Sequence, residues 1–320
     1  MAIRKYFLQF DFKFNFFQSL KGFTLMVDRA VAATPASSKS STWAKRWWQP
    51  LRRQPSALAG LSIVGAYLLL AAFAPLFATH DPILQDFAVA LQPPSLEHWL
   101  GTDSFGQDVY SRVLYGARLA LWIGFASVFL GLFGGMSIGL IAGLVGGRLE
   151  WALMRLVDAI LAFPEIILAM AFIAVLGLGI ENLIYALAVS FVGPFARIVR
   201  SDVLQVKALP FIEAAQLMGV SSWRIILRHL VPNVMSSLLV QAGIRISTAI
   251  LLASGLSFFG IGVVPPTPDW GLIIAEGRGF ITMAPWISGF PGAALALLLV
   301  GLTLLGDGLR NALNPSSEGR

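Results

Sequence analysis

The sequence predicts an all-α membrane protein with six transmembrane helices. Of its 320 residues, 57% are hydrophobic and only 12% are charged, and the mean hydropathy is +0.75. Ordinary soluble domains carry roughly 25% charged residues. Six stretches also approach the ~20 apolar residues that a helix needs to cross the hydrocarbon core of a bilayer. These observations place the chain in the membrane class and leave room for one helical bundle.

The six predicted spans differ in their charges. The third carries Asp158 and Glu165, and the fifth carries Arg245. Charged side chains within a span are costly and usually face the bundle interior or water. Glu165 and Arg245 therefore either line a substrate path or form an internal ion pair, whereas a structural role is favoured for Asp158. The spans lie near residues 57–78, 119–146, 156–178, 182–200, 232–257 and 287–306.

The distribution of lysine and arginine predicts that both termini are cytoplasmic. With the N-terminus inside, the basic tail and the basic loops 148–155 and 197–228 all lie inside. The outer segments then hold only Arg112, Arg118 and Arg278. Basic residues near span ends are retained on the cytoplasmic side, so the opposite orientation is disfavoured. The net charge of +6 is thus a topology signal and does not indicate nucleic-acid binding.

The ends of the chain are predicted to lie outside the membrane domain. Residues 1–55 form a cytoplasmic tail, of which 1–41 is expected to be disordered. This tail lacks the long apolar core of a signal peptide, and Met26 is an alternative start. The membrane domain is predicted to span 56–315, and a short tail, 316–320, follows.

Several kinds of chemistry are not expected in this chain. It has no cysteine, which excludes disulfides and thiolate metal sites. No P-loop of the form GxxxxGK[ST] occurs, so any ATP chemistry must come from a partner. An intramembrane enzyme would need a nucleophile or a metal set within the bundle, and none is expected. The outer loop 79–112 does hold His80, Asp81, Asp86, Glu97, His98, Asp103 and Asp108, but their spacing matches no known metal site and no metal is expected.

The second predicted span carries a glycine at every fourth position. Glycine at this spacing lets the backbone of another helix approach closely. General enrichment of glycine in membrane helices is the alternative, but five glycines in register favour close packing. They are Gly131, Gly135, Gly139, Gly143 and Gly147.

The segment between the fourth and fifth spans predicts a compact helix–turn–helix at the inner face of the membrane. Pro210 suits the start of a short helix and Gly219 its end. Ser221 or Ser222 can cap a second short helix, and Pro232 lies near the start of the fifth span. A rigid connection of this kind can transmit motion between domains, although an ordinary amphipathic loop fits the same residues.

Five separated blocks of the sequence resemble a known family. Residues 213–219, which read EAAQLMG, resemble the EAA motif of binding-protein-dependent ABC importer permeases. Residues 98–118, HWLGTDSFGQDVYSRVLYGAR, are similar to a signature of the dipeptide/oligopeptide/nickel permeases of the C type. The remaining blocks are LMRLVDAILAFP (153–164), LSFFGIGVVPPTPDWG (256–271) and LGDGLRNALNP (305–315). The resemblance extends from about residue 55 to residue 315 and implies the type I permease fold of ABC importers.

The resemblance also implies the partners and the site residues. A C-type permease works in the cell inner membrane with a homologous B-type permease, two ABC ATPase subunits and an extracytoplasmic substrate-binding protein, for which the outer loop is the expected surface. ATP and Mg²⁺ would bind the ATPase subunits, and no cofactor is expected here. The residues implied in ATPase coupling are Glu213, Ala214, Ala215 and Gly219 within a coupling segment 209–231, and those of the outer-loop motif are Gly101, Thr102, Asp103, Gly106 and Asp108.

Some features of the chain leave alternatives open. Gln107 stands where the family usually has arginine, and Ala253 where many members have glutamate. The proline-rich stretch 265–268 predicts a stiff outer turn that either shapes an outer gate or folds back on the bundle. Peptide is the expected substrate, with nickel chelates, glutathione or opines as alternatives. An ion-coupled secondary transporter is the alternative of a different class, and it would show inverted repeats and broken helices; the sequence contains no convincing repeat.

Overall fold

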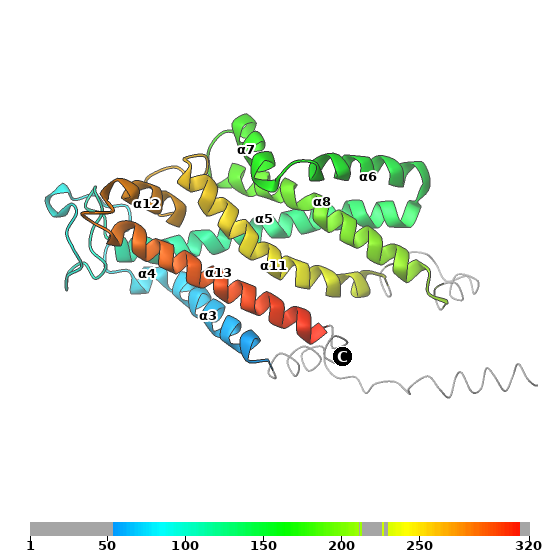
Figure 1. Ribbon diagram of the computed structural model, residues 1–320, viewed down its shortest axis with the longest axis horizontal. Coiled ribbons are helices and arrows are strands. Elements are labelled where there is room, and N and C mark those ends of the chain that lie inside the picture. Colours follow the sequence, from blue (N-terminus) through cyan, green and yellow to red (C-terminus); the bar gives the residue numbers. More distant parts are fainter. Residues whose placement is uncertain (1–53, 211, 213–225, 227–229, 314–320) are drawn as a thin grey trace, which may run out of the picture. The chain divides into compact units, whose positions relative to one another are not determined.

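The structure, a computed structural model, describes residues 54–210, 212, 226 and 230–313. Residues 1–53 of the predicted N-terminal tail, with Met26, and the tail 316–320 lie outside these residues. Within the described part, five helices are long and apolar enough to cross a membrane, or six if one bent pair counts as a single span. The five are α3 (Pro55–Ala72), α5 (Val109–Val145), α8 (Ile180–Lys207), α11 (Val231–Phe258) and α13 (Trp286–Leu313) (Figure 1).

Helix α5 begins well before the predicted second span because a capping residue precedes it. The side chain of Asp108 accepts a hydrogen bond from the backbone N–H of Ser111 at 2.8 Å, which satisfies one of the free N–H groups of the first turn. The helix continues for 37 residues to Gly146, whose φ of +71° ends it. The first turns, with Arg112, therefore belong to the helix rather than to the outer loop.

The predicted third span, 156–178, is wrong as a single helix. The structure divides it into α6 (Gly147–Leu161) and α7 (Glu165–Leu176), which meet at 94°. Pro164 lies at the break and disfavours helical backbone at Phe163, so the proline in this stretch already signalled the interruption. With 15 and 12 residues, each half falls short of the ~20 that cross a bilayer upright.

The predicted fourth span, 182–200, is too short. Helix α8 runs for 28 residues to Lys207 and contains Pro194 in its interior. The hydropathy falls at Arg197 and Arg200, where the predicted span ends, but the helix continues past both arginines, whose guanidinium groups pair with Asp158 and Glu150 of α6.

Helices α5 and α8 approach closely through glycine (Figure 1). A Cβ atom on Gly135 would lie 2.7 Å from the carbonyl oxygen of Val192, and one on Gly139 would lie 2.6 Å from that of Ala196. Gly131 and Gly143 face α8 in the same way. The predicted close packing therefore holds for four of the glycines.

The fifth glycine does not take part in this packing. Gly147 begins α6 with a φ of +61°, and nothing lies within 4 Å of the place where its Cβ would be. Residues 135–139 read GMSIG, a match to the GxSxG pattern of some hydrolases that the expectation of no catalytic motif overlooked. The serine of that pattern stands on a strand-to-helix turn, whereas Ser137 lies inside α5 and donates to the carbonyl oxygen of Phe133, so it carries no sign of an activated nucleophile.

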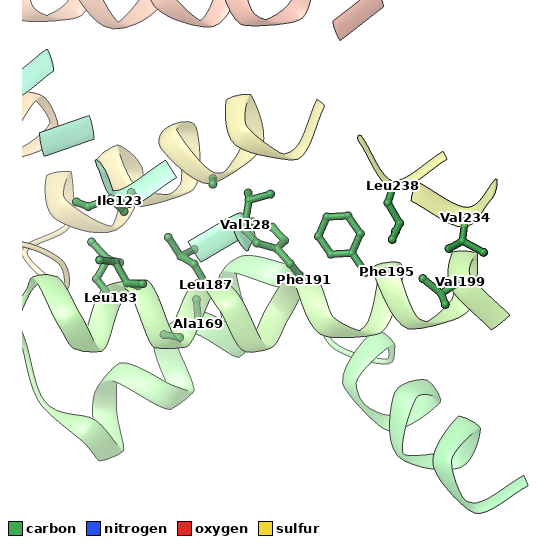
Figure 2. Close-up of a cluster of buried hydrophobic side chains, with 14 of the residues drawn as sticks. Ile123, Val128, Ala169, Leu183, Leu187, Phe191, Phe195, Val199, Val234 and Leu238 are labelled. Carbon is green, nitrogen blue, oxygen red and sulfur yellow. The ribbon is translucent and has the colours of Figure 1, made fainter. Parts of the chain in front are cut away.

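The largest hydrophobic cluster lies between α5, α7, α8 and α11 (Figure 2). Phe191 and Phe195 of α8 are fully buried in it, together with Ile123 of α5 and Leu238 of α11. Ala253, at one of the positions that depart from the family pattern, is buried in the same cluster.

A second cluster joins α3 and α13. Glycines again allow the contact: a Cβ on Gly60 would lie 2.7 Å from the carbonyl oxygen of Gly301, and one on Gly308 would lie 2.8 Å from the Cα of Ala57. The hydroxyl of Tyr67 donates to the carbonyl oxygen of Ala294 at 2.9 Å. These glycines follow no four-residue register, and the sequence pattern did not reveal them.

The proline-rich turn leads into a segment that packs on the bundle. This segment is the short helix α12 (Trp270–Gly277), which the side chain of Asp269 caps. Trp270 is fully buried, and its indole Nε1 donates to the carbonyl oxygen of Val113 of α5 at 3.0 Å. Pro265 and Pro266 are themselves exposed, so both alternatives for the turn stay predictions. The remaining described elements are α4 (Ala74–Phe77), η1 (Phe87–Val89) and η3 (Arg278–Phe280).

The α5–α8 contact makes a stability prediction. We expect Gly139→Ala to destabilise the detergent-solubilised protein by about 1–3 kcal/mol, because the added methyl group meets backbone that cannot move aside. The measurement is the midpoint of thermal unfolding. Gly255→Ala on α11 is the matched control, since a Cβ there meets nothing within 4 Å and alanine favours helix over glycine. Equal midpoints for the two variants would contradict the packing role.

Candidate functional site

Asp103 organises the outer-loop motif. Its buried carboxylate accepts hydrogen bonds from the backbone N–H groups of Phe105 and Gln107 through Oδ1, both at 2.8 Å. The side-chain Nε2 of Gln107 donates to the carbonyl oxygen of Ile83 at 3.1 Å. The glutamine that replaces the usual arginine is therefore buried within the loop and serves as a donor there.

The two glycines of the motif occupy positions that other residues would strain. Gly101 and Gly106 have φ angles of +77° and +73°, a region that favours glycine. A Cβ on Gly101 would also lie 2.6 Å from the carbonyl oxygen of Gln92, and one on Gly106 would collide with the backbone oxygen of Asp86. Both glycines thus shape the loop backbone.

Thr102 connects the motif to α13. Its carbonyl oxygen accepts a hydrogen bond from the indole Nε1 of Trp286, the first residue of that helix, at 3.0 Å. Its hydroxyl accepts from the backbone N–H of Gln92 at 2.9 Å, and its backbone forms an isolated bridge with Asp108. All five predicted residues of the motif are therefore brought together around the start of α5.

A buried arginine ties the motif to two helices. Arg112, in the first turn of α5, forms an ion pair with Asp103 and a second with Glu276 of α12 at 3.1 Å. Its side chain is 1% exposed. Removing one member of such a group leaves the others buried without compensation, which is strongly unfavourable. The ion pairs of Arg112 with Asp103 and Glu276, called the Arg112 cluster below, therefore connect the outer loop, α5 and α12.

Burial raises the pKa of two carboxyl groups of the α12 region, those of Glu276 and Asp269. Burial raises the pKa of Glu276 and outweighs the opposing attraction of the Arg112 guanidinium. Burial also raises the pKa of Asp269 to about 6, against the lowering effect of its hydrogen bond from the backbone N–H of Leu272. Both groups hold α12 in place, Glu276 through Arg112 and Asp269 as the capping residue.

The structure pairs Glu165 with Arg245. Glu165 is the first residue of α7, at the break in the predicted third span, and its Oε1 contacts Nη1 of Arg245 on α11. The guanidinium carbon of Arg245 also lies 5.6 Å from the ring centroid of Phe191. The two side chains are 31% and 24% exposed. The ion-pair interpretation describes this geometry, and a role in lining a path stays a prediction.

Ion pairs and hydrogen bonds connect the C-terminal part of α8 to α5 and α6. Asp158 pairs with Arg197 at 2.7 Å, and Glu150 pairs with Arg200 at 2.5 Å. Lys207 donates from Nζ to the carbonyl oxygens of residues 143 and 144, the last turn of α5, both at 3.1 Å. The structural role favoured for Asp158 is consistent with its pair.

The four predicted coupling residues lie outside the described residues. These are Glu213, Ala214, Ala215 and Gly219, all within 213–225. The structure does describe the residues on either side of this stretch. Ile212 and Leu230 are buried in the same cluster as Val206 of α8 and Val234 of α11.

Three residues that hold the outer-loop motif in place are not among the predicted site residues. Arg112 is predicted only as an outer charge, although an arginine four residues after a capping aspartate signals a place in the first helical turn. Glu276 is 164 residues from Arg112, and nothing in the sequence links them. Trp286 lies one residue before the predicted sixth span, 287–306, and no motif marks it.

Two family models match the chain. Residues 135–318 match the model described as binding-protein-dependent transport system inner membrane component. Residues 41–94 match the model for the N-terminal transmembrane domain of oligopeptide transport permease C. The first match covers more than half of the chain, and the second covers the region before the outer-loop motif.

Curated relatives agree with these matches. A dipeptide transport system permease protein of Alkalihalophilus pseudofirmus is 42% identical over 278 residues, which are 87% of this chain and 91% of that protein. A glutathione transport system permease protein of Escherichia coli is 42% identical over 274 residues, 85% and 90% of the two chains. A probable D,D-dipeptide transport system permease protein of Escherichia coli is 35% identical over 296 residues, 92% and 99%.

A solved structure supports the fold. A chain of the methionine ABC transporter MetNI, in an inward-facing conformation, superposes with a TM-score of 0.52 and 21% identity, over 63% of this chain and 96% of that chain. At this identity the likeness speaks to the fold alone. The family model over residues 135–318 and the curated relatives show that the chain belongs to the family of binding-protein-dependent transport system inner membrane components, the permease subunits of ABC importers.

Proposed function

We propose that this permease forms one half of a peptide-translocation pathway and transmits the motion of ATPase subunits through residues 209–231. The observation that carries the proposal is the agreement of relatives over 85–92% of the chain, because those relatives are named for dipeptides, D,D-dipeptides and glutathione. Peptide-like solutes are common to all three. Glutathione itself, nickel chelates and opines remain the alternative cargo.

The partners follow from the same proposal. The other half of the pathway is a homologous B-type permease, two ABC ATPase subunits bind ATP and Mg²⁺, and an extracytoplasmic binding protein delivers the solute. Both termini are placed in the cytoplasm, with the chain in the inner membrane. The membrane domain is taken as residues 56–315, and no cofactor is assigned to this chain.

The contacts around the coupling segment support its role. Ile212 and Leu230, which flank the undescribed stretch, are each 1% exposed within the main hydrophobic cluster. Lys207 fastens the end of α8 to the last turn of α5. A force applied to 213–225 would therefore act on three packed helices rather than on a loose loop. Glu213 is assigned to pairing with the ATPase or to local capping, and Gly219 to backbone geometry.

The broken third span could also suggest an ion-coupled secondary transporter. Glu165 at such a break is the kind of intramembrane carboxylate that proton- or sodium-coupled carriers use. Arg245 neutralises it here, and the family match places the energy source in separate ATPase subunits. The importer is therefore the function that the observations favour.

The first test identifies the cargo. The cognate extracellular binding protein should bind dipeptides tightly, and cells that lack this permease should lose ATP-dependent uptake of the same labelled dipeptide. Isothermal titration of the binding protein against peptides, glutathione, opines and nickel chelates measures the first part. Tight binding of a nickel chelate without any binding of peptides would contradict the proposed substrate.

The second test concerns coupling. We expect Gly219→Trp to insert normally but to lose uptake almost completely, because a bulky side chain at the end of the first predicted helix displaces the segment from the ATPase. Membrane content by immunoblot and uptake of labelled dipeptide are measured together. Gly65→Trp is the control of equal bulk, since a Cβ at Gly65 meets nothing within 4 Å. Uptake at the wild-type rate by Gly219→Trp would contradict the proposed role of residues 209–231 in ATPase coupling.

The third test concerns Glu165 and Arg245, which we assign to a clamp between α7 and α11. Glu165→Gln and Arg245→Gln should each destabilise the solubilised protein, and the double variant should be more stable than their sum predicts by about 0.5–3 kcal/mol. The exchanged pair, Glu165→Arg with Arg245→Glu, should regain stability and uptake. An exchanged pair that is stable but does not transport would contradict the clamp and assign the two charges to the pathway.

A further inference from the structure

Two histidines and an aspartate converge where the outer loop meets α5. His80 follows α4, His98 precedes the outer-loop motif, and Asp108 caps α5. Each offers one ligand atom, and the three atoms lie within 4.8 Å of one another. Nδ1 of His98 lies 3.0 Å and Nδ1 of His80 lies 3.9 Å from the same oxygen, Oδ1 of Asp108.

The second oxygen of Asp108 is already used. Oδ2 accepts hydrogen bonds from the backbone N–H and the hydroxyl of Ser111 at 2.8 and 2.7 Å, and from the hydroxyl of Thr79 at 3.3 Å. These contacts orient the carboxylate so that Oδ1 faces the two imidazoles. Such outer contacts also fix the ligands of metal sites in proteins.

Hydrogen bonds hold the backbone at both histidines, and Nδ1 of His80 also lies 3.1 Å from the hydroxyl oxygen of Thr79. The N–H of His80 donates to the hydroxyl of Ser111 at 3.1 Å, and the N–H of His98 donates to that of Ser95 at 3.0 Å. The two rings are 4.6 Å apart at their centroids and tilted by 32°. Ligands arranged before the ion arrives lose little conformational freedom on binding.

The spacing and chemistry suit one kind of ion. Zn²⁺ binds imidazole nitrogen and carboxylate oxygen at about 2.0–2.2 Å in tetrahedral geometry, which places neighbouring ligand atoms roughly 3.4 Å apart. The observed 3.0 and 3.9 Å lie on either side of that value. Mg²⁺ and Ca²⁺ prefer oxygen ligands alone. We propose that His80, His98 and Asp108 form a Zn²⁺ site on the outer face of the permease.

Burial gives the site one open side. The side chains of Asp108 and His98 are 1% and 7% exposed, whereas that of His80 is 36% exposed. Three protein ligands would leave the fourth position of the ion to water or to a group from a partner on the outer side. The ion would link His80, which precedes η1, to Asp108 at the start of α5, close to the ion pairs of Arg112.

A hydrogen bond between His98 and Asp108 is the simpler account of the same cluster. That bond needs neither His80 nor a metal, so His80 is the residue that separates the two accounts. Few other side chains of the chain could bind Zn²⁺ through nitrogen or sulfur, because it has no cysteine and only three histidines. The third, His229, lies far away in sequence, in the segment predicted to be cytoplasmic.

The test is titration of Zn²⁺ into the purified full-length permease carrying an affinity tag without histidine. We expect one Zn²⁺ per chain for the wild type and for the control His229→Ala, with at least about 100-fold weaker binding for His80→Ala and His98→Ala. Zn²⁺ should raise the thermal midpoint of the wild type but not that of His80→Ala. This second measurement also shows that the His80 variant is folded.

Two results of the Zn²⁺ titration would overturn the site. One is the lack of stoichiometric Zn²⁺ binding by the wild type, and the other is equal binding by wild type and His80→Ala. A midpoint raised equally by Mg²⁺ would also contradict the proposal, since the ligand set excludes a preference for that ion. The experiment measures neither transport nor ATPase coupling, and residues 209–231 enter it only through the control His229→Ala, so its outcome is independent of the proposed transport function.

Discussion

The close contact between α5 and α8 is the constraint on which the other helices depend. Lipid gives helices no hydrophobic reason to associate, so contact at short range has to hold them together. Glycines of α5 allow backbone carbonyls of α8 to approach to van der Waals distance, and no larger residue fits there. Phe191 and Phe195 begin at this contact, since their Cβ atoms face Gly131 and Gly135 of α5, and both are buried in the cluster that also contains Leu238 of α11 (Figure 2). The main hydrophobic cluster is thus built outward from this one helix pair.

The break at Pro164 separates two helices whose carboxylates pair with arginines of other helices. Arg197 and Arg200 lie in the second half of α8, and their partners, Asp158 and Glu150, come from α6, on one side of the break. On the other side, the first carboxylate of α7 lies next to the arginine of α11. The two halves of the predicted third span thus supply carboxylates to three arginines, which links α6 to α8 and α7 to α11.

Much of this fold could be predicted from the sequence, and the failures have physical reasons. Hydropathy located all six apolar stretches, and the four-residue glycine register revealed the tightest helix contact. The length of α8 was underestimated because hydropathy treats Arg200 as exposed, while tertiary structure gives it Glu150. Resemblance located the outer-loop motif. The ion pair between Arg112 and Glu276 could not be predicted, because these residues are far apart in sequence and meet only in the folded structure. The same holds for His80 and His98, whose ligand atoms converge from positions with no regular spacing.

Helix α5 also links the two faces of the molecule mechanically. Its first turn holds Arg112, which pairs with Asp103 of the outer-loop motif and with Glu276 of α12. Its last turn accepts the hydrogen bonds of Lys207, the last residue of α8. Between these ends the helix contributes to both hydrophobic clusters, with Ile123 in one and Leu121 in the other. Because α5 is one continuous helix of 37 residues, the ion pairs at its first turn, the two clusters and the end of α8 are all attached to a single element.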